Sequence, residues 1–196
     1  MRNPEVTREK ILKQSGTLFN TRGYKATSIG DITKATGLTK GAIYRHFKSK
    51  AGLEKETLAH LSGIMVETLR DEIKSQPTAG KKLRAIFRFF ETYISKPVVK
   101  GGCPLMNAAV EADDAHPQLR KRAITLLDLL CSSIESIIDK GIKYGQLKSE
   151  VDKQYYATVI VAGLEGAIMM SKLRGNDEDI RRVTKHLENL ITEMEL

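Results

Sequence analysis

A short run from Thr39 to Phe47 holds the residues of this sequence whose types and spacing best suit a chemical task. In a helix, which turns about 100° per residue, Ile43 and Phe47 share one inner face. Gly41 and Arg45 then point away from that face. A helix with small residues at its N-terminal end can approach base edges closely, and an arginine further along can form bidentate contacts to guanine. The run therefore predicts a helix that reads DNA.

Neighbouring helix N-termini are suited to bind the phosphates on either side of those bases. Free backbone amides and hydroxyls at such termini donate to phosphate oxygens. Tyr44 and His46 can add hydrogen bonds to phosphates, and Lys40 adds charge. The predicted DNA-contacting residues are Thr27, Ser28, Thr39, Lys40, Gly41, Ala42, Tyr44, Arg45, His46 and Lys50.

The excess positive charge of the chain lies entirely in its first quarter. Residues 1–50 hold 11 Lys and Arg against 3 Asp and Glu, whereas the remaining 146 residues hold 21 of each. Clustered cations bind polyanions because they displace counterions from phosphates. A solubilising surface would also be basic, so charge alone leaves both interpretations open.

Hydrophobic residues recur at helical spacing along almost the whole chain, which predicts an all-α protein. We expect an N-terminal helix-turn-helix domain of three helices and a larger C-terminal helical domain, with about nine helices in all. Gly37 provides the tight turn between the second and third helices. The expected helices cover residues 7–22, with a possible earlier start at Asn3-Pro4, 28–36, 40–47, 50–76, 80–95, 104–113, 117 to 141 or 145, 151–173 and 177–195.

The order of residues in the first domain resembles that of TetR-type transcriptional regulators. The resemblance rests on Gly23 to Ile29, Ile32, Gly37, the run from Thr39 to Phe47 and Lys50, and it covers residues 7 to about 55 nearly continuously. In the rest of the chain it extends only to length, helix count and the stretch from Gly102 to Glu111. It implies a homodimer whose C-terminal domains bind a small molecule and move two DNA-reading heads.

The expected domain boundary follows from charge and helix length. Residues 1–50 form the predicted DNA-binding domain, and residues 51–196 form the predicted effector-binding and dimerisation domain. A long helix over residues 50–75 links the two and is the plausible lever between them.

Aromatic and sulfur-containing residues suggest an effector cavity among the C-terminal helices, since such side chains shape adaptable apolar pockets. An ordinary hydrophobic core explains the same pattern equally well. Cys103, next to Gly101-Gly102 at a predicted helix start, is a hypothetical sensor of electrophiles or oxidants, with a small inert side chain as the alternative. The predicted ligand-binding residues are Phe87, Phe90, Tyr93, Cys103, Met106 and Met169.

Small residues on the next-to-last helix allow another helix to approach closely. They are Ala157, Ala162, Gly163, Gly166 and Ala167. In a monomer this pattern would serve internal packing, whereas the resemblance implies a dimer interface built from the last two helices of each chain. The apolar stretch 155–170 is short for a membrane span and is predicted to be a buried helix.

The sequence offers little for catalysis, metal binding or cofactors, and we predict none of them. The four histidines are scattered, and the two cysteines form no CxxC pair. Glu111, Asp113 and Asp114 are adjacent acids without a partnered base. The N-terminus lacks an apolar signal segment, so a cytoplasmic protein is expected.

These features together predict a ligand-responsive transcriptional regulator, a homodimeric repressor that a small-molecule effector releases from a palindromic operator. The rival hypotheses are an architectural DNA-binding protein without sequence preference and, less favoured, a helical small-molecule-binding protein or enzyme.

Overall fold

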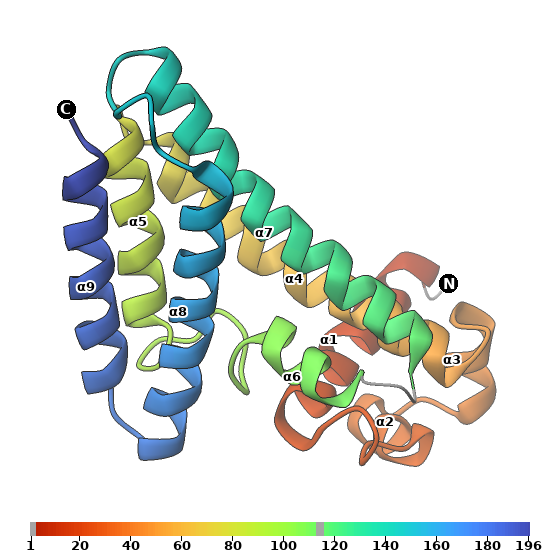
Figure 1. The fold of residues 1–196 in the computed structure, drawn as a ribbon. Coiled ribbons are helices and arrows are strands. Elements are labelled where there is room, and N and C mark those ends of the chain that lie inside the picture. The colour runs from red at the N-terminus through yellow and green to blue at the C-terminus, as the bar shows by residue number, and fades with distance from the viewer. Residues whose placement is uncertain (1–2, 113–115) are drawn as a thin grey trace. The chain divides into compact units, whose positions relative to one another are not determined.

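The computed structural model describes residues 3–112 and 116–196, and it confirms the all-α fold (Figure 1). Over these residues nine helices form and no strand is present beyond an isolated bridge between Leu147 and Glu195. The predicted acids Asp113 and Asp114 lie outside the described residues. The helices are α1 (Pro4–Arg22), α2 (Ile29–Thr36), α3 (Lys40–His46), α4 (Lys50–Lys74), α5 (Ala79–Thr92), α6 (Pro104–Glu111), α7 (Pro117–Lys143), α8 (Lys153–Arg174) and α9 (Glu178–Met194).

Local capping sets the boundaries of the first three helices. α1 begins at Pro4 rather than Thr7, because the Asn3 side chain accepts a hydrogen bond from the Glu5 amide at 2.9 Å. Ser28 and Asp31 form the predicted capping box at the start of α2. Gly37 ends α2 in the left-handed conformation, with φ of 66°, which a glycine adopts without strain.

The chain divides into two compact units, which differ from the predicted domains. The first unit contains residues 1–64 and 99–126, and the second contains residues 65–98 and 127–196. α6 and the first part of α7 thus belong with α1–α3. The predicted functional boundary at residue 50 stays a prediction.

Aromatic stacking fills the core of the first unit. Phe19 on α1 and Tyr24 in the following turn stack with their ring centroids 4.9 Å apart, and both side chains are fully buried. Burial raises the pKa of the Tyr24 hydroxyl, and the nearby carboxylates Glu111 and Glu54 raise it further. α2 packs on both α1 and α3, so this core supports the helix-turn-helix.

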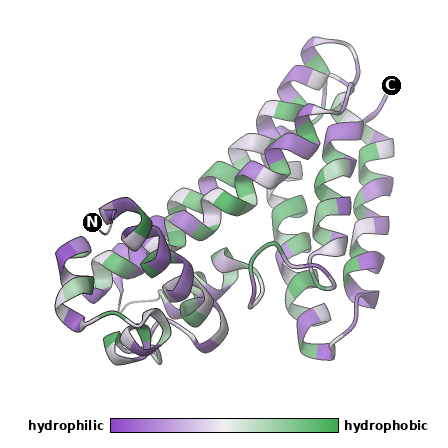
Figure 2. Cartoon of the chain, turned by 180° about the vertical axis from the view of Figure 1, so that it is seen from behind, coloured by the Kyte–Doolittle hydropathy of each residue, from purple (hydrophilic) through white to green (hydrophobic). Residues whose placement is uncertain are grey.

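In the second unit α5, α8 and α9 lie side by side. Each of these helices carries both hydrophobic and hydrophilic residues (Figure 2), and the hydrophobic ones meet in the core. At one edge, the Arg84 guanidinium donates to both carboxylate oxygens of Glu195, at 2.7 and 2.9 Å. This pairing lowers the pKa of the Glu195 carboxyl and ties α5 to the C-terminal end of α9.

Candidate nucleic-acid interface and effector cavity

α3 has one buried face and one exposed face, as its spacing predicts. Ile43 and Phe47, at its end, are 0% and 2% exposed, so they anchor the helix in the core of the first unit. Tyr44 and Arg45 lie on the outside. Of the other predicted contacts in this segment, Thr39, Lys40 and Gly41 are exposed, and Ala42 and His46 are half-buried.

The exposed face of α3 keeps its donors available. Thr39 Oγ1 accepts from the Ala42 amide at 3.2 Å, which leaves the hydroxyl proton free to donate to a phosphate. Among the described residues, neither Lys40 nor Arg45 forms an ion pair. A Cβ at Gly41 would meet nothing within 4 Å, so the surface there is open. This face can therefore approach a polyanion closely.

Two of the residues predicted to bind phosphates make contacts within the first unit. Thr27 is 1% exposed, and its hydroxyl donates to the carbonyl of Gly23 at 2.7 Å. The Lys50 ammonium donates to the carbonyl of Tyr24 at 2.7 Å and pairs with the carboxylate of Glu54 at 3.3 Å. Because Glu54 is 3% exposed, Lys50 neutralises a buried charge, and both Thr27 and Lys50 hold the first unit together.

Ser28 is exposed, but its donors are already engaged. Its amide and its hydroxyl both donate to Asp31 Oδ2, at 2.8 and 2.5 Å. These hydrogen bonds lower the pKa of the Asp31 carboxyl, so a negative charge occupies the N-terminus of α2. A phosphate at this position would have to displace that carboxylate.

A polar network joins α6 to the turn that precedes α2, and the sequence alone gave no sign of it. Glu111 Oε1 accepts from the Tyr24 amide at 2.9 Å, and Oε2 accepts from the Lys25 amide at 2.8 Å. Asn107 Nδ2 donates to the carbonyl and side-chain oxygens of Asn20 at 3.0 and 2.9 Å. Gly23, with φ of 95°, lets Glu111 come this close, since a Cβ there would lie 2.8 Å from the carboxylate. α6 is thereby fixed to the helix-turn-helix.

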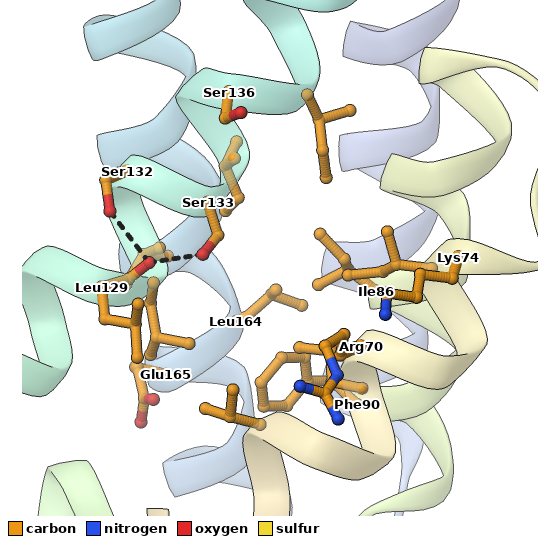
Figure 3. Close-up of a pocket in the computed structure, with 17 residues that line it drawn as sticks. Arg70, Lys74, Ile86, Phe90, Leu129, Ser132, Ser133, Ser136, Leu164 and Glu165 are labelled. Atoms are coloured by element: carbon orange, nitrogen blue, oxygen red, sulfur yellow. Dashed lines mark hydrogen bonds between the residues drawn. The ribbon is translucent and has the colours of Figure 1, made fainter. Parts of the chain in front are cut away.

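The second unit contains a cavity of about 460 Å³, within the range of ~300–1,000 Å³ that suits small organic ligands (Figure 3). α4, α5, α7 and α8 all contribute to its walls. The lining residues are Val66, Leu69, Arg70, Ile73, Lys74, Ile86, Phe90, Leu129, Leu130, Ser132, Ser133, Ile134, Ser136, Ile137, Val161, Leu164 and Glu165.

Of the six residues predicted to bind a ligand, Phe90 lines this cavity and the other five do not. Phe87 and Tyr93 are each 1% exposed and fill the core instead. Met169 is 45% exposed on the surface of α8. Cys103 and Met106 belong to the first unit.

Two features would have improved the cavity prediction. One is the group of serines that interrupts the apolar sequence of α7 at positions 132, 133 and 136, and the other is the position of Arg70 beside Leu69 on α4. Both place exposed polar groups next to apolar residues that line the cavity. Cys103 is 2% exposed, and this burial weakens the hypothesis that it senses electrophiles.

α8 is only partly buried, contrary to the prediction of a buried helix. Its inner face, which includes Ile160, Leu164 and Ile168, packs in the second unit. Its outer face exposes apolar and small residues: Tyr155, Ala162, Met169, Met170 and Leu173. Among the described helices, α8 has the length and hydropathy of a membrane span, although a core helix of a soluble protein meets the same test.

Comparison with known proteins gives matches to both parts of the chain. A family model described as bacterial regulatory proteins of the tetR family matches residues 11–57, and one described as a tetracyclin repressor-like C-terminal domain matches residues 79–187. The crystal structure of a TetR transcriptional regulator from Chloroflexus aurantiacus is 34% identical, with a TM-score of 0.94, and the match covers 100% of this chain and 98% of that one.

Two further relatives carry functional names. The HTH-type transcriptional repressor DhaR of Mycobacterium sp. (strain GP1) is 22% identical over 88% of this chain and 86% of its own. The TetR family transcriptional regulator CifR, in a cysteine mutant complexed with a 26-base-pair operator, has a TM-score of 0.84 at 23% identity. That match covers 92% of this chain and 94% of the other, and it shows a shared fold.

Proposed function

This chain belongs to the TetR family of transcriptional regulators, and from that premise we propose that it is a homodimeric repressor released from its operator by a small-molecule effector. It is a DNA-binding regulator that responds to a ligand. The observation that carries the proposal is the exposed face of α3, with Lys40, Gly41, Tyr44 and Arg45 outside and Ile43 inside. Membership of this family does not favour the alternative of an architectural DNA-binding protein without sequence preference.

The proposed DNA contacts divide into two kinds. Arg45, exposed and without an ion pair, is proposed to read a guanine edge in the major groove. Thr39, Lys40 and Tyr44 are proposed to bind phosphates, together with the half-buried His46. Gly41 and Ala42 let the helix lie close to the bases. Residues 1–50 are the proposed DNA-binding domain, although Glu54 and α6 help to build it.

Arg45→Ala tests this assignment. Operator sequences are first selected from a random oligonucleotide pool with the wild-type protein. We expect Arg45→Ala to weaken binding to the selected operator by about 1–3 kcal/mol and to relax the preference at one base pair. Lys40→Ala is the matched comparison, and it should weaken binding to all sequences alike and reduce the salt dependence by about one counterion. Wild-type affinity and base preference for Arg45→Ala at fixed salt would contradict the docking.

The exposed face of α8 supports the proposed homodimer. It presents small and apolar residues, and a Cβ at Gly166 would meet nothing within 4 Å. Such a face lets the backbone of another helix approach closely. We place the two-fold interface on α8 and α9 of each chain, in a four-helix arrangement. Two α3 helices would then enter successive major grooves, about 34–36 Å apart, on a palindromic operator.

The cavity of the second unit is the proposed effector site. An effector that binds the DNA-incompetent state more tightly than the DNA-competent state lowers operator affinity. The loss equals the difference between the effector's binding free energies for the two states, usually about 1–3 kcal/mol. α4 supplies Leu69, Arg70 and Ile73 to the cavity and continues without a break to Lys50 in the first unit. This continuity makes α4 the proposed lever. The proposed setting is the cytoplasm, where a bacterial operator lies, and no catalytic step is involved.

A further inference from the structure

The effector cavity combines apolar walls with a small, unequal set of charges. Its apolar side chains come from all four helices, for example Leu69 of α4, Phe90 of α5, Ile134 of α7 and Leu164 of α8. Burial of an apolar ligand body against them is favourable in proportion to the area removed from water. The interior therefore selects a ligand with a hydrophobic body.

Two cations project from one side of the cavity. Arg70 and Lys74 are four residues apart on α4, so they lie on the same helix face, and both line the cavity (Figure 3). The Arg70 side chain is 56% exposed, and its ion pair with Asp71 is a long one, 3.8 Å from Nε to Oδ1. Both residues are exposed, so their charges can meet a ligand without the penalty of a buried, unpaired charge.

The other polar groups of the lining do not balance these cations. Glu165 of α8 is the one carboxylate among the lining residues, against two cations. The hydroxyls of Ser132 and Ser133 are uncharged. They already donate to the carbonyl of Leu129, at 3.2 and 2.6 Å. A cationic ligand would meet two like charges at the α4 wall, and a neutral ligand would gain hydrogen bonds there but no ion pair.

We propose that the effector is a small organic anion with an apolar body. Its anionic group, a carboxylate, sulfonate or phosphate, lies between Arg70 and Lys74. The apolar body lies against Leu69, Phe90, Ile134 and Leu164. This inference rests on the proposed function, because it assigns a ligand class to the cavity that the proposed function names as the effector site.

A matched pair of fluorescent probes tests the ligand class. 1-Anilinonaphthalene-8-sulfonate is an aromatic anion, and N-phenyl-1-naphthylamine is the same ring system without the sulfonate. Each is titrated into the full-length protein and followed by its fluorescence, which rises in an apolar site. An exposed ion pair is worth at most about fivefold in affinity. We expect Arg70→Gln and Lys74→Gln each to weaken the sulfonate by about threefold, and the double variant by about tenfold, with the uncharged probe changed less than about twofold.

Two control variants locate the effect. Arg88→Gln removes an exposed cation of α5 that does not line the cavity, and it should leave both probes unchanged. Ser133→Phe places a ring into the cavity from the exposed side of α7 and should weaken both probes by about tenfold. Equal loss of both probes in the Arg70→Gln/Lys74→Gln double variant, no loss of either, or no binding of the sulfonate at ~1 mM would overturn the proposal.

The same probes separate this inference from the proposed function. Fluorescence anisotropy of a labelled, selected operator is measured with each probe present. Release by the uncharged probe alone would overturn the anion assignment and leave the effector site in place. If the sulfonate binds with the expected loss in the Arg70→Gln/Lys74→Gln double variant but neither probe changes operator affinity, the ligand class stands and the coupling to DNA fails.

Discussion

α3 and α8 are two helices with similar interiors and opposite exteriors. α3 buries Ile43, and α8 buries Ile160 and Ile168, so each is anchored by aliphatic side chains. The exposed side of α3 carries Lys40 and Arg45, whereas that of α8 carries small and apolar residues. The buried faces specify the fold, and the exposed faces carry the two proposed partner surfaces, for a polyanion on α3 and for a second copy of α8.

The first prediction tests the division between the two faces of α3. Phe47→Ala should lower the free energy of unfolding by about 3–5 kcal/mol, because it removes a buried ring over which the Arg8 guanidinium also lies, 5.2 Å from the centroid. Tyr44→Ala, on the exposed face, is the control and should change it by less than about 0.5 kcal/mol. Urea denaturation measures both, and similar losses for the two variants would contradict the division.

The second prediction concerns the exposed face of α8. Ala162→Glu should raise the dissociation constant of the dimer by roughly a hundredfold, or about 3 kcal/mol, because two carboxylates would be buried without partners in a symmetric interface. Analytical ultracentrifugation over a range of concentrations measures this. Ser75→Glu adds the same charge at an exposed position just after α4 and should leave association unchanged. A dimer as tight as the wild type in Ala162→Glu would remove α8 from the interface.

The third and smallest effect is expected at the contact between α6 and the turn before α2. Glu111→Gln should destabilise the protein by about 1–2 kcal/mol, because the amide can accept from only one of the Tyr24 and Lys25 amides and leaves the other unpaired. Glu67→Gln, on an exposed part of α4, is the matched control. Thermal unfolding compares them, and equal midpoints would show that Glu111 adds nothing to stability.

Local patterns made α3 predictable from the sequence. The cap at Thr39, the capping box at Ser28 and the inward spacing of Ile43 and Phe47 all depend on residues within a few positions of one another. The internal contacts of Thr27 and Lys50 were not predicted. Thr27 donates to a carbonyl only four residues away, at Gly23, whereas the partner of Lys50 is set by tertiary packing. The carbonyl that holds Lys50 lies 26 residues away in the sequence, at Tyr24.

The cavity was less predictable for a related reason. Phe87, Phe90 and Tyr93 have the same chemistry and nearly the same spacing, yet only Phe90 lines the cavity. The helices packed around α5 decide which ring is covered and which faces the open space. No spacing rule within α5 contains that information. The polar residues Arg70 and Ser133 do line the cavity, and both are exposed residues beside apolar ones.

The carboxylate of Glu111 also has a consequence for protein synthesis. It satisfies two amides that precede it by 87 and 86 residues, so the turn beside Tyr24 lacks its acceptor until more than half of the chain has left the ribosome. Domains otherwise fold as units in the order of translation. The nascent helix-turn-helix therefore reaches its complete set of hydrogen bonds late, after the chain has been made through α6.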